Sequence, residues 1–165
     1  MTNAYDYIKE SLRKNLKEKL IEFRKQKSII RVEKPTDIGR ARKLGYKDKK
    51  GFIIVRVRLK RGKHKRPRPN KGRKTRNLTT EKSLKMNYRW IAEIRAQKKY
   101  PSLEVLNSYK VAKDGKYYWF EVIMVDPNRD EIKKDKIINW ICSNKNRKRA
   151  LRGLTSAAKK ARGLR

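Results

Sequence analysis

The side chains that could support acid–base or nucleophilic chemistry are few in this sequence. His64 is the only histidine and lies in a run of lysines and arginines, with no carboxylate nearby to orient its ring. An imidazole base needs such a partner. Cys142 is the only cysteine and follows Trp140 and Ile141, which predicts a small half-buried thiol rather than a nucleophile with a base beside it. We therefore predict no catalytic residues.

Metal and nucleotide sites are not indicated either. One cysteine and one histidine cannot supply a zinc site. Asp126, Asp130 and Asp135 could gather Mg²⁺, but a turn and a helix cap explain them more simply, and flanking lysines would compete for the carboxylates. The phosphate-binding patterns G-x-x-x-x-G-K-[ST] and G-x-G-x-x-G do not occur. We expect no metal, no cofactor and no small-molecule substrate.

The sequence instead has an excess of groups that bind polyanions. It contains 50 Lys and Arg against 16 Asp and Glu, a net charge of +34 over 165 residues. Self-repulsion of this size opposes compaction unless counter-charge is supplied. The longest apolar runs, residues 52–55 and 122–125, are far too short to span a membrane. Residues 1–10 show no secretory signal, and a single cysteine fits a reducing cytosol. Nucleic acid in the cytoplasm is the expected partner, and no membrane is expected.

The cations are densest between residues 61 and 80. No carboxylate occurs between Lys49 and Thr80, so the charges have no local ion-pair partners. Pro67 and Pro69 favour an extended backbone. We predict an extended RNA-binding arm over residues 61–80 rather than a solvated disordered linker. The candidate contacts in it are Arg61, Lys63, His64, Lys65, Arg66, Arg68, Lys71, Arg73, Lys74 and Arg76.

Two elements before the arm add further cations. The alternation over residues 52–60 predicts a strand with Ile53, Val55, Val57 and Leu59 buried on one face. The other face would present Arg56, Arg58 and Lys60 to RNA, a solvated sheet surface being the alternative. The sequence DIGRARKL, with Thr36 as its cap and Gly45 at its end, predicts a short helix. That helix would present Arg40, Arg42 and Lys43.

The last cationic segment is a tail from residue 143 to residue 165, and no acidic residue follows Asp135. Thr155 could cap a short helix of Ser, Ala and Lys that ends at Gly163 and has no hydrophobic face. The small side chains of this helix would let its backbone lie close to RNA phosphates. The candidate contacts are Arg147, Lys148, Arg149, Arg152, Lys159, Lys160, Arg162 and Arg165.

The remaining pattern predicts an α+β body. One amphipathic helix is expected over residues 5–23 with Asn3 as its cap, and another from a cap at Thr79 or Thr80 to Tyr100. Two strands follow, at 103–111 and 117–125, joined by a type I′ turn at Asp114-Gly115. The second is apolar on both faces, as in a central strand. We expect a small, mostly antiparallel sheet flanked by helices in one domain of residues 1–165, whose body comprises residues 1–60 and 81–142.

Several motifs resemble one family closely. They are RVEKPTDIGRARKLGYKDKKG, FIIVRVRLKRGKHKRPRPNKGR, YPSLEVLNSYKVAKDGKYYWFEVIMVDP and NWICSNKNRKRALRGLTSAAKKARGLR. In this order they resemble protein fifteen of the large ribosomal subunit, in its archaeal and eukaryotic form. The resemblance implies a structural ribosomal protein that binds large-subunit ribosomal RNA and touches neighbouring ribosomal proteins, with no catalytic centre. It also implies extended basic segments, which fall here on Arg61 to Arg76 and on Arg147 to Arg165.

Two other functions are compatible with the composition. A non-ribosomal basic nucleic-acid-binding protein, for example of chromatin, would have similar charge, but would not carry these motifs. An RNA-processing nuclease would need His64 or the three aspartates for turnover, and we expect no such activity.

Overall fold

The computed structural model describes residues 4–68, 70–72 and 79–164. Its centre is a four-stranded antiparallel sheet in the order β1-β2-β6-β5. The strands are β1 (Ile29–Val32), β2 (Phe52–Lys60), β5 (Glu104–Lys113) and β6 (Tyr117–Val125). The predicted α+β class with a small antiparallel sheet is confirmed. The apolar strand β6 lies between β2 and β5, which explains why it is apolar on both faces.

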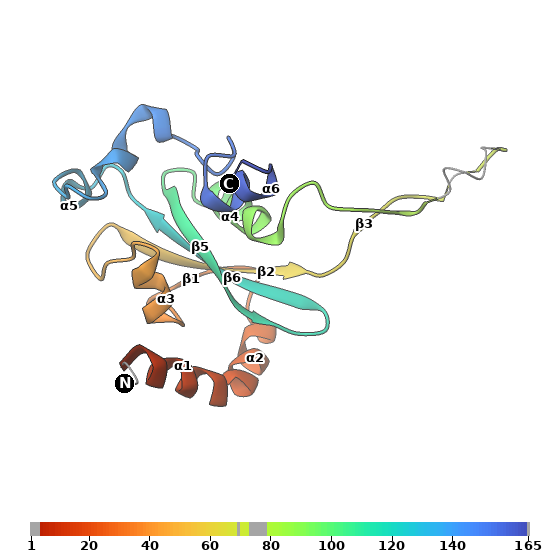
Figure 1. Ribbon diagram of the computed structural model, residues 1–165, viewed down its shortest axis with the longest axis horizontal. Coiled ribbons are helices and arrows are strands. Elements are labelled where there is room, and N and C mark those ends of the chain that lie inside the picture. The colour runs from red at the N-terminus through yellow and green to blue at the C-terminus, as the bar shows by residue number, and fades with distance from the viewer. Residues whose placement is uncertain (1–3, 69, 73–78, 165) are drawn as a thin grey trace.

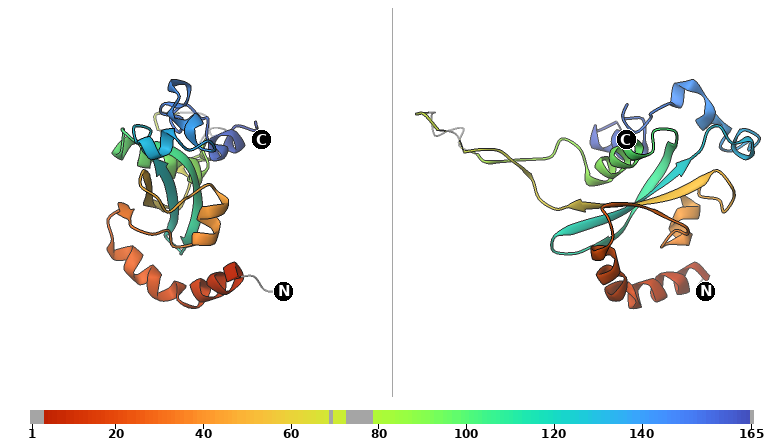
Figure 2. Two further views of the ribbon diagram at one scale, coloured as in Figure 1. Left: turned by 90° about the vertical axis from the view of Figure 1, so that its left-hand side faces the viewer. Right: turned by 180° about the vertical axis from the view of Figure 1, so that it is seen from behind.

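Helices cover both faces of the sheet (Figure 1). Helix α4 (Tyr88–Lys99) and the short helix α6 (Ser156–Ala161) lie on one face. Helices α1 (Ala4–Lys14), α2 (Leu16–Lys25) and α3 (Ile38–Lys43) lie on the other. The chain ends of the described structure therefore lie on opposite sides of the sheet, as both views in Figure 2 show.

The larger core lies between the sheet and α4. Val55, Val57 and Leu59 of β2 point to this face, as the alternation in the sequence predicts. They pack with Phe120, Val122 and Met124 of β6 and with Ala92 and Ala96 of α4. The two alanines let the helix approach the sheet closely, which makes α4 the fixed support for everything attached to that face.

The opposite face carries smaller clusters and not a solvated surface. Ile54, Tyr109 and Ile123 pack against Ala41 of α3, and Trp119 packs against Phe23 of α2 with ring centroids 6.2 Å apart. The amphipathic stripe predicted over residues 5–23 is present, but it is divided between α1 and α2, which meet at Asn15. The cap predicted at Asn3 lies outside the described residues.

Two local predictions are wrong. Residues 114–116 connect β5 to β6 without positive φ at Asp114 or Gly115, so the turn is not type I′. Asp114 Oδ1 instead accepts hydrogen bonds from the backbone N–H groups of Lys116 (2.7 Å) and Tyr117 (2.5 Å), which close a longer loop. Helix α4 begins at Tyr88 rather than near Thr80, because Asn87 caps it by accepting from the Trp90 N–H at 2.8 Å.

The segment after β6 passes over the end of the sheet before returning to α4. It contains α5 (Asp130–Lys133) and the 3₁₀ turns η2 (Asn139–Cys142) and η3 (Asn144–Asn146). Ile132, Ile138 and Ile141 anchor this segment against Val125. No helix in the described ranges is long and apolar enough to cross a membrane.

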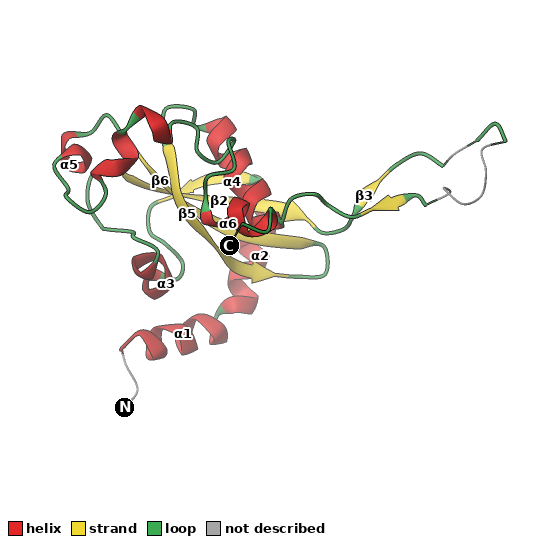
Figure 3. Ribbon diagram, turned by 45° about the horizontal axis from the view of Figure 1, so that its top comes forward, coloured by secondary structure: helices red, strands yellow, loops and turns green. Residues whose placement is uncertain are grey.

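The arm is a two-stranded hairpin that projects far from the body (Figures 1 and 3). Strand β3 (His64–Lys65) pairs with β4 (Glu81–Lys82), with His64 opposite Lys82 and Lys65 opposite Glu81. An extended arm was predicted, but its return strand was assigned to the next helix. The hydrogen bond from Arg66 N–H to the Thr80 carbonyl, at 3.0 Å, continues this pairing outward.

Candidate nucleic-acid interface

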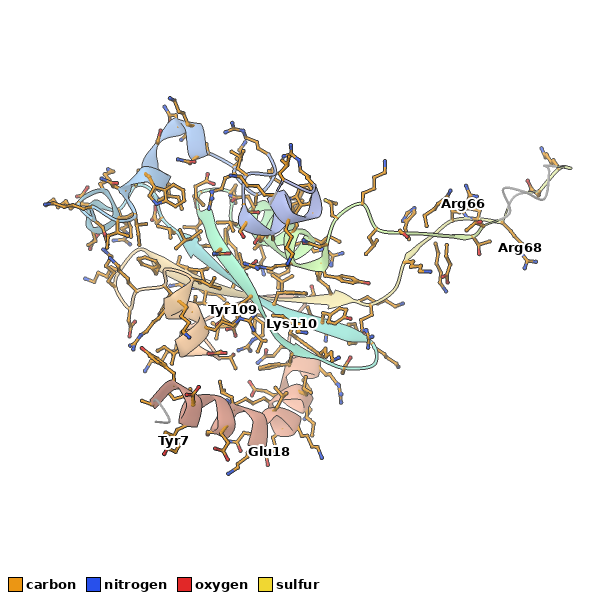
Figure 4. The ribbon with its side chains drawn as sticks, in the orientation of Figure 1. Tyr7, Glu18, Arg66, Arg68, Tyr109 and Lys110 are labelled. Carbon is orange, nitrogen blue, oxygen red and sulfur yellow. The ribbon has the colours of Figure 1, made fainter. Side chains whose placement is uncertain are left out.

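Most described cations of the arm are directed to solvent. Arg66 and Arg68 lie on the hairpin, well clear of the body (Figure 4). Arg66 is half-buried because its Nε donates to the Thr79 carbonyl at 2.6 Å, which ties the two strands together. The remaining described candidates of this segment are all exposed: Arg61, Lys63, His64, Lys65, Arg68 and Lys71. Arg73, Lys74 and Arg76 lie outside the described residues.

The arm has almost no internal counter-charge. Glu81 is the only carboxylate from residue 61 to residue 82. Its Oε2 lies 3.9 Å from Lys63 Nζ, and both side chains are largely exposed. An exposed pair at this distance stabilises little, since water screens it. The hairpin therefore carries a nearly uniform positive charge that only an external anion can offset.

The base of the arm is held to the body by one tyrosine and one arginine. Tyr88 Oη donates to the Gly62 carbonyl (2.7 Å) and accepts from the Gly62 N–H (2.9 Å). Arg61 donates to the Asp114 carbonyl at 2.7 Å and stacks over the Tyr118 ring at 5.0 Å. A cavity of about 580 Å³ opens at this base. Its cationic lining includes Arg61, Lys63, Lys65 and Arg95.

Arg56 is the clearest correction to the predicted contacts. Its side chain is only 9% exposed and is paired with the fully buried Glu121. Nε and Nη2 donate to Glu121 Oε1 at 3.2 and 3.1 Å, and Nη2 also donates to Thr36 Oγ1 at 2.8 Å. The guanidinium lies 3.9 Å from the centre of the Phe23 ring. Arg56 therefore neutralises a carboxylate inside the protein and is not available to RNA.

The two other cations of that strand face are less enclosed. Arg58 is half-buried, since it donates to the Arg24 carbonyl at 2.6 Å and stacks over Tyr117 at 4.9 Å. Lys60 is exposed at the end of β2. The strand thus changes along its length from a buried internal charge at Arg56 to a free one at Lys60, next to the base of the arm.

Helix α3 presents its three predicted cations outward. Arg40, Arg42 and Lys43 are all exposed. The helix is capped by Asp37, whose Oδ1 accepts from the Arg40 N–H at 2.9 Å, and not by the predicted Thr36. Thr36 instead donates to Glu121 through both its N–H and its hydroxyl, which fixes the start of α3 to the sheet.

The C-terminal segment is docked on the body and is not a free tail. Helix α6 does have a hydrophobic face, formed by the buried Ala157 and Ala158, which corrects the prediction. Thr155 is its cap as predicted, accepting from the Ala158 N–H at 3.3 Å. The Thr155 hydroxyl also donates to Glu93, a buried carboxylate of α4 that Ser108 contacts too. Burial raises the pKa of Glu93, and these hydroxyl bonds partly offset that effect.

Three arginines of this segment hold its own loops in shape. Arg149 donates to the carbonyls of Val105 and Leu106, both at 2.8 Å, and stacks over Trp140 at 4.8 Å. Arg152 donates to the Lys145 carbonyl at 2.8 Å, and Arg162 donates to that of Gly153 at 3.3 Å. Arg149 is half-buried, whereas the other described candidates are exposed: Arg147, Lys148, Arg152, Lys159, Lys160 and Arg162. Arg165 lies outside the described residues.

The groups considered for catalysis or metal binding have other partners. Asp135 accepts from Lys47 (2.7 Å) and Lys49 (2.6 Å), and these lysines hold its pKa far below the usual range. Asp126 closes a turn by accepting from the Asn128 N–H at 3.0 Å. Within the described ranges, no group of three potential ligands could hold a metal ion. Burial raises the pKa of the Cys142 thiol, so a smaller fraction of it is thiolate at neutral pH.

A comparison with protein families agrees with this cationic structure. The model of the family described as Ribosomal L15 matches residues 3–165, essentially the whole chain. The chain belongs to this ribosomal family. It is the form found in archaea and eukaryotes, as the sequence motifs indicated.

Membership of the Ribosomal L15 family establishes the broad role. Proteins of this family are structural constituents of the large ribosomal subunit, located in cytoplasmic ribosomes, and they are not enzymes. The family implies contact with ribosomal RNA and with other ribosomal proteins. It does not by itself say which residues of this chain make those contacts.

Some exposed cations near the interface were not predicted from the sequence. Lys82 lies on the return strand of the arm and Arg95 lines the cavity at its base. Both fall in the stretch assigned to an amphipathic helix, and no role was predicted for their charges. Recognising that residues 79–82 pair with the arm would have identified Lys82.

Proposed function

We propose that this chain binds and bridges large-subunit ribosomal RNA through two cationic surfaces, the arm and the C-terminal segment. The arm is the hairpin of residues 61–82, and the second surface is formed by the exposed cations between residues 147 and 162. Both surfaces are attached to the N-terminal half of α4, since Tyr88 contacts the arm and Trp90 and Glu93 contact the C-terminal segment. One rigid helix thus fixes the spacing of both.

The observation that carries the proposal is the lack of counter-charge in the arm. Its exposed cations meet only Glu81, whereas cations elsewhere in the body, such as Arg56 and Lys47, have buried or partly buried carboxylate partners. The exposed lysines of the arm therefore have one exposed carboxylate between them, whereas Arg56 and Lys47 each contact a more buried carboxylate. RNA phosphates would displace condensed counterions there, and this release would supply most of the affinity.

Specificity would come from the shape of the RNA. A narrow two-stranded hairpin can enter between packed RNA helices, where it meets phosphates on more than one side. Arginines can bridge phosphates bidentately or stack on bases, which lysines cannot do. Folded ribosomal RNA, with its irregular single-stranded features, suits such a projection better than regular duplex does.

Shortening the arm tests this proposal. Because His64 faces Lys82, residues 65–81 can be replaced by Asn-Gly, a two-residue turn that closes a hairpin between paired positions. We expect the body to unfold at an unchanged urea concentration, while affinity for purified large-subunit ribosomal RNA falls at least about tenfold at moderate salt. Affinity would be measured by filter binding over a series of salt concentrations, and incorporation by reconstitution of subunits.

A second variant separates charge from shape. Replacing Lys63, Lys65, Arg68 and Lys71 by glutamine keeps the hairpin and removes exposed charge. Each lost phosphate contact should reduce the slope of log affinity against log salt by about 0.7–0.9. The proposal is wrong if the shortened chain binds ribosomal RNA with the original affinity and salt slope and still enters subunits.

A further inference from the structure

A groove on the other side of the molecule from α4 has the composition of a nucleotide site. It lies between the N-terminal helices and α3, has a volume of about 460 Å³, and falls within the range of pockets that hold small molecules, about 300–1,000 Å³. Leu12, Leu16 and Val111 supply its apolar lining. No described residue of the arm or of the C-terminal segment lines it.

The rim of the groove is cationic and unpaired. Lys19, Arg40, Lys43 and Lys110 line it from three separate elements, α2, α3 and β5. The side chains of Arg40, Lys43 and Lys110 are exposed, and in the described part of the chain none of the four forms an ion pair. This differs from Lys47 and Lys49, which share Asp135 nearby. The groove is therefore complementary to an anion with an apolar part.

Tyr5 gives the groove a fixed aromatic wall. Its ring lies against Gly39 so closely that a Cβ on that glycine would be 2.8 Å from Tyr5 Cδ1. Its hydroxyl accepts a hydrogen bond from Arg42 at 3.2 Å. A side chain at position 39 would collide with the Tyr5 ring, which explains the glycine there. Gly39 and Arg42 thus fix the position of Tyr5, which lines the groove.

Asp37 makes the groove unsuitable for a purely anionic ligand. Its Oδ1 accepts from the Arg40 N–H, and the carboxylate lines the groove together with Tyr5. A carboxylate repels phosphate but accepts hydrogen bonds from the amino and imino groups of a base. Cations for phosphate, an aromatic ring for stacking and an acceptor for a base edge are the parts of a single-nucleotide site.

We propose that this groove holds one unstacked nucleotide of RNA, with the base against Tyr5 and its phosphates against the lysines of the rim. The inference rests on the proposed function, since the chain must lie on RNA for such a nucleotide to be offered. It adds a third contact, which reads a flipped base rather than duplex backbone.

Two oligonucleotides of equal charge test the site. The full chain would be titrated with an eight-nucleotide single-stranded RNA and with the same strand carrying abasic residues at its centre. Because stacking on one aromatic side chain contributes on the order of a tenfold gain, we expect the intact strand to bind about tenfold more tightly. Tyr5→Leu keeps an apolar contact with Gly39 but removes the ring, so it should abolish this difference.

Tyr7→Leu is the matched control. Tyr7 is on the same helix, is 63% exposed and lies on the side facing away from the sheet (Figure 4). It should leave the preference for the intact strand unchanged. Photocrosslinking with 5-iodouridine in the strand should label Tyr5 in the parent chain and in the variant with the shortened arm.

The outcomes separate this site from the arm. Equal affinity for the two strands, with salt-sensitive binding of ribosomal RNA intact, overturns the nucleotide site and leaves the proposed function standing. Full ribosomal RNA affinity after arm shortening, with the Tyr5 crosslink retained, supports the nucleotide site and overturns the role of the arm. Binding of the intact strand with no crosslink at Tyr5 would overturn the nucleotide site as well, because the base would then lie elsewhere on the protein.

Discussion

At the residue scale, Arg56 shows that the fold decides which of the 50 lysines and arginines remain exposed. The strand alternates correctly, but the face that bears Arg56 is covered by α2 and the start of α3, so this arginine needs a carboxylate. Glu121 supplies it from the adjacent strand, directly opposite in the register. A one-signed strand face in the sequence therefore does not imply an exposed one when the counter-ion comes from a neighbouring strand.

Glu121→Ala should destabilise the protein strongly. The carboxylate is fully buried and accepts hydrogen bonds from Thr36, Arg56 and Tyr109, so its loss leaves a buried guanidinium unpaired. Breaking such a pair from one side costs about 3–5 kcal/mol. Urea denaturation followed by circular dichroism measures the change. Glu33→Ala, at an exposed position, should alter the free energy of unfolding by no more than about 0.5 kcal/mol.

A loss below about 1 kcal/mol for Glu121→Ala would contradict this account of the pair. It would mean that Arg56 reaches solvent in the variant, which would return it to the candidates for RNA contact.

At the element scale, the docking of α6 depends on its small residues. Ala157 and Ala158 are buried beside α4, and the carbonyl of Ala157 accepts a hydrogen bond from Asn87, the cap of that helix. Ala158→Arg would place a long charged side chain in this contact and should release the segment. We expect trypsin to cleave after Lys159 and Lys160 at least about tenfold faster than in the parent chain, because local opening exposes the backbone.

The control for Ala158→Arg adds the same residue at a free position. Leu164 is 61% exposed, so Leu164→Arg increases the charge equally without touching α4. Cleavage at Lys159 and Lys160 should keep its original rate. Faster cleavage in both variants would indicate that added charge, and not undocking, opens the segment.

The elements with strong periodicity were predictable, and those decided by distant contacts were not. Strands β2, β5 and β6 and helix α4 follow from alternation and apolar spacing, apart from the ends. The start of α4 was misplaced because the apolar Leu84 lies four residues before Tyr88, at helical spacing. In the structure, Glu81 and Lys82 instead form the return strand of the arm, and the helix begins only after Asn87. The alanine face of α6 was missed since alanine carries little hydrophobic signal, although it packs closely.

The candidate sites divide in the same way. The arm was identified because its charge lies in one continuous stretch of sequence. The groove beside Tyr5 could not be, because its cations come from residues 19, 40, 43 and 110, which only the packing of α2 and α3 near β5 brings together.

At the scale of the whole molecule, the net charge of +34 predicts opposite effects of salt on stability and on binding. Screening relieves self-repulsion among the unpaired cations, so the free protein should melt at a higher temperature as salt rises from low to physiological concentration. The same salt should weaken RNA binding, since counterion release contributes less. Calorimetry of the free chain and filter binding to ribosomal RNA, done in the same buffers, check both signs.

The arm-shortened variant provides the comparison for salt. It has fewer unpaired cations, so salt should raise its melting temperature less than that of the parent chain. A melting temperature that falls with salt in both proteins would show that the screening of exposed ion pairs, such as Lys14–Glu10, outweighs the relief of repulsion.

The bond between Thr155 and Glu93 also sets an order for biosynthesis. Glu93 precedes Thr155 in the chain by 62 residues, and until Thr155 is synthesised Ser108 is the one of its two hydroxyl donors that is present. A nascent chain that stops short of residue 155 therefore carries an ionisable group without its second hydroxyl donor, and α6 is not yet packed against α4. The cations of α6 therefore reach their final positions only after Thr155 has been synthesised and can bind Glu93.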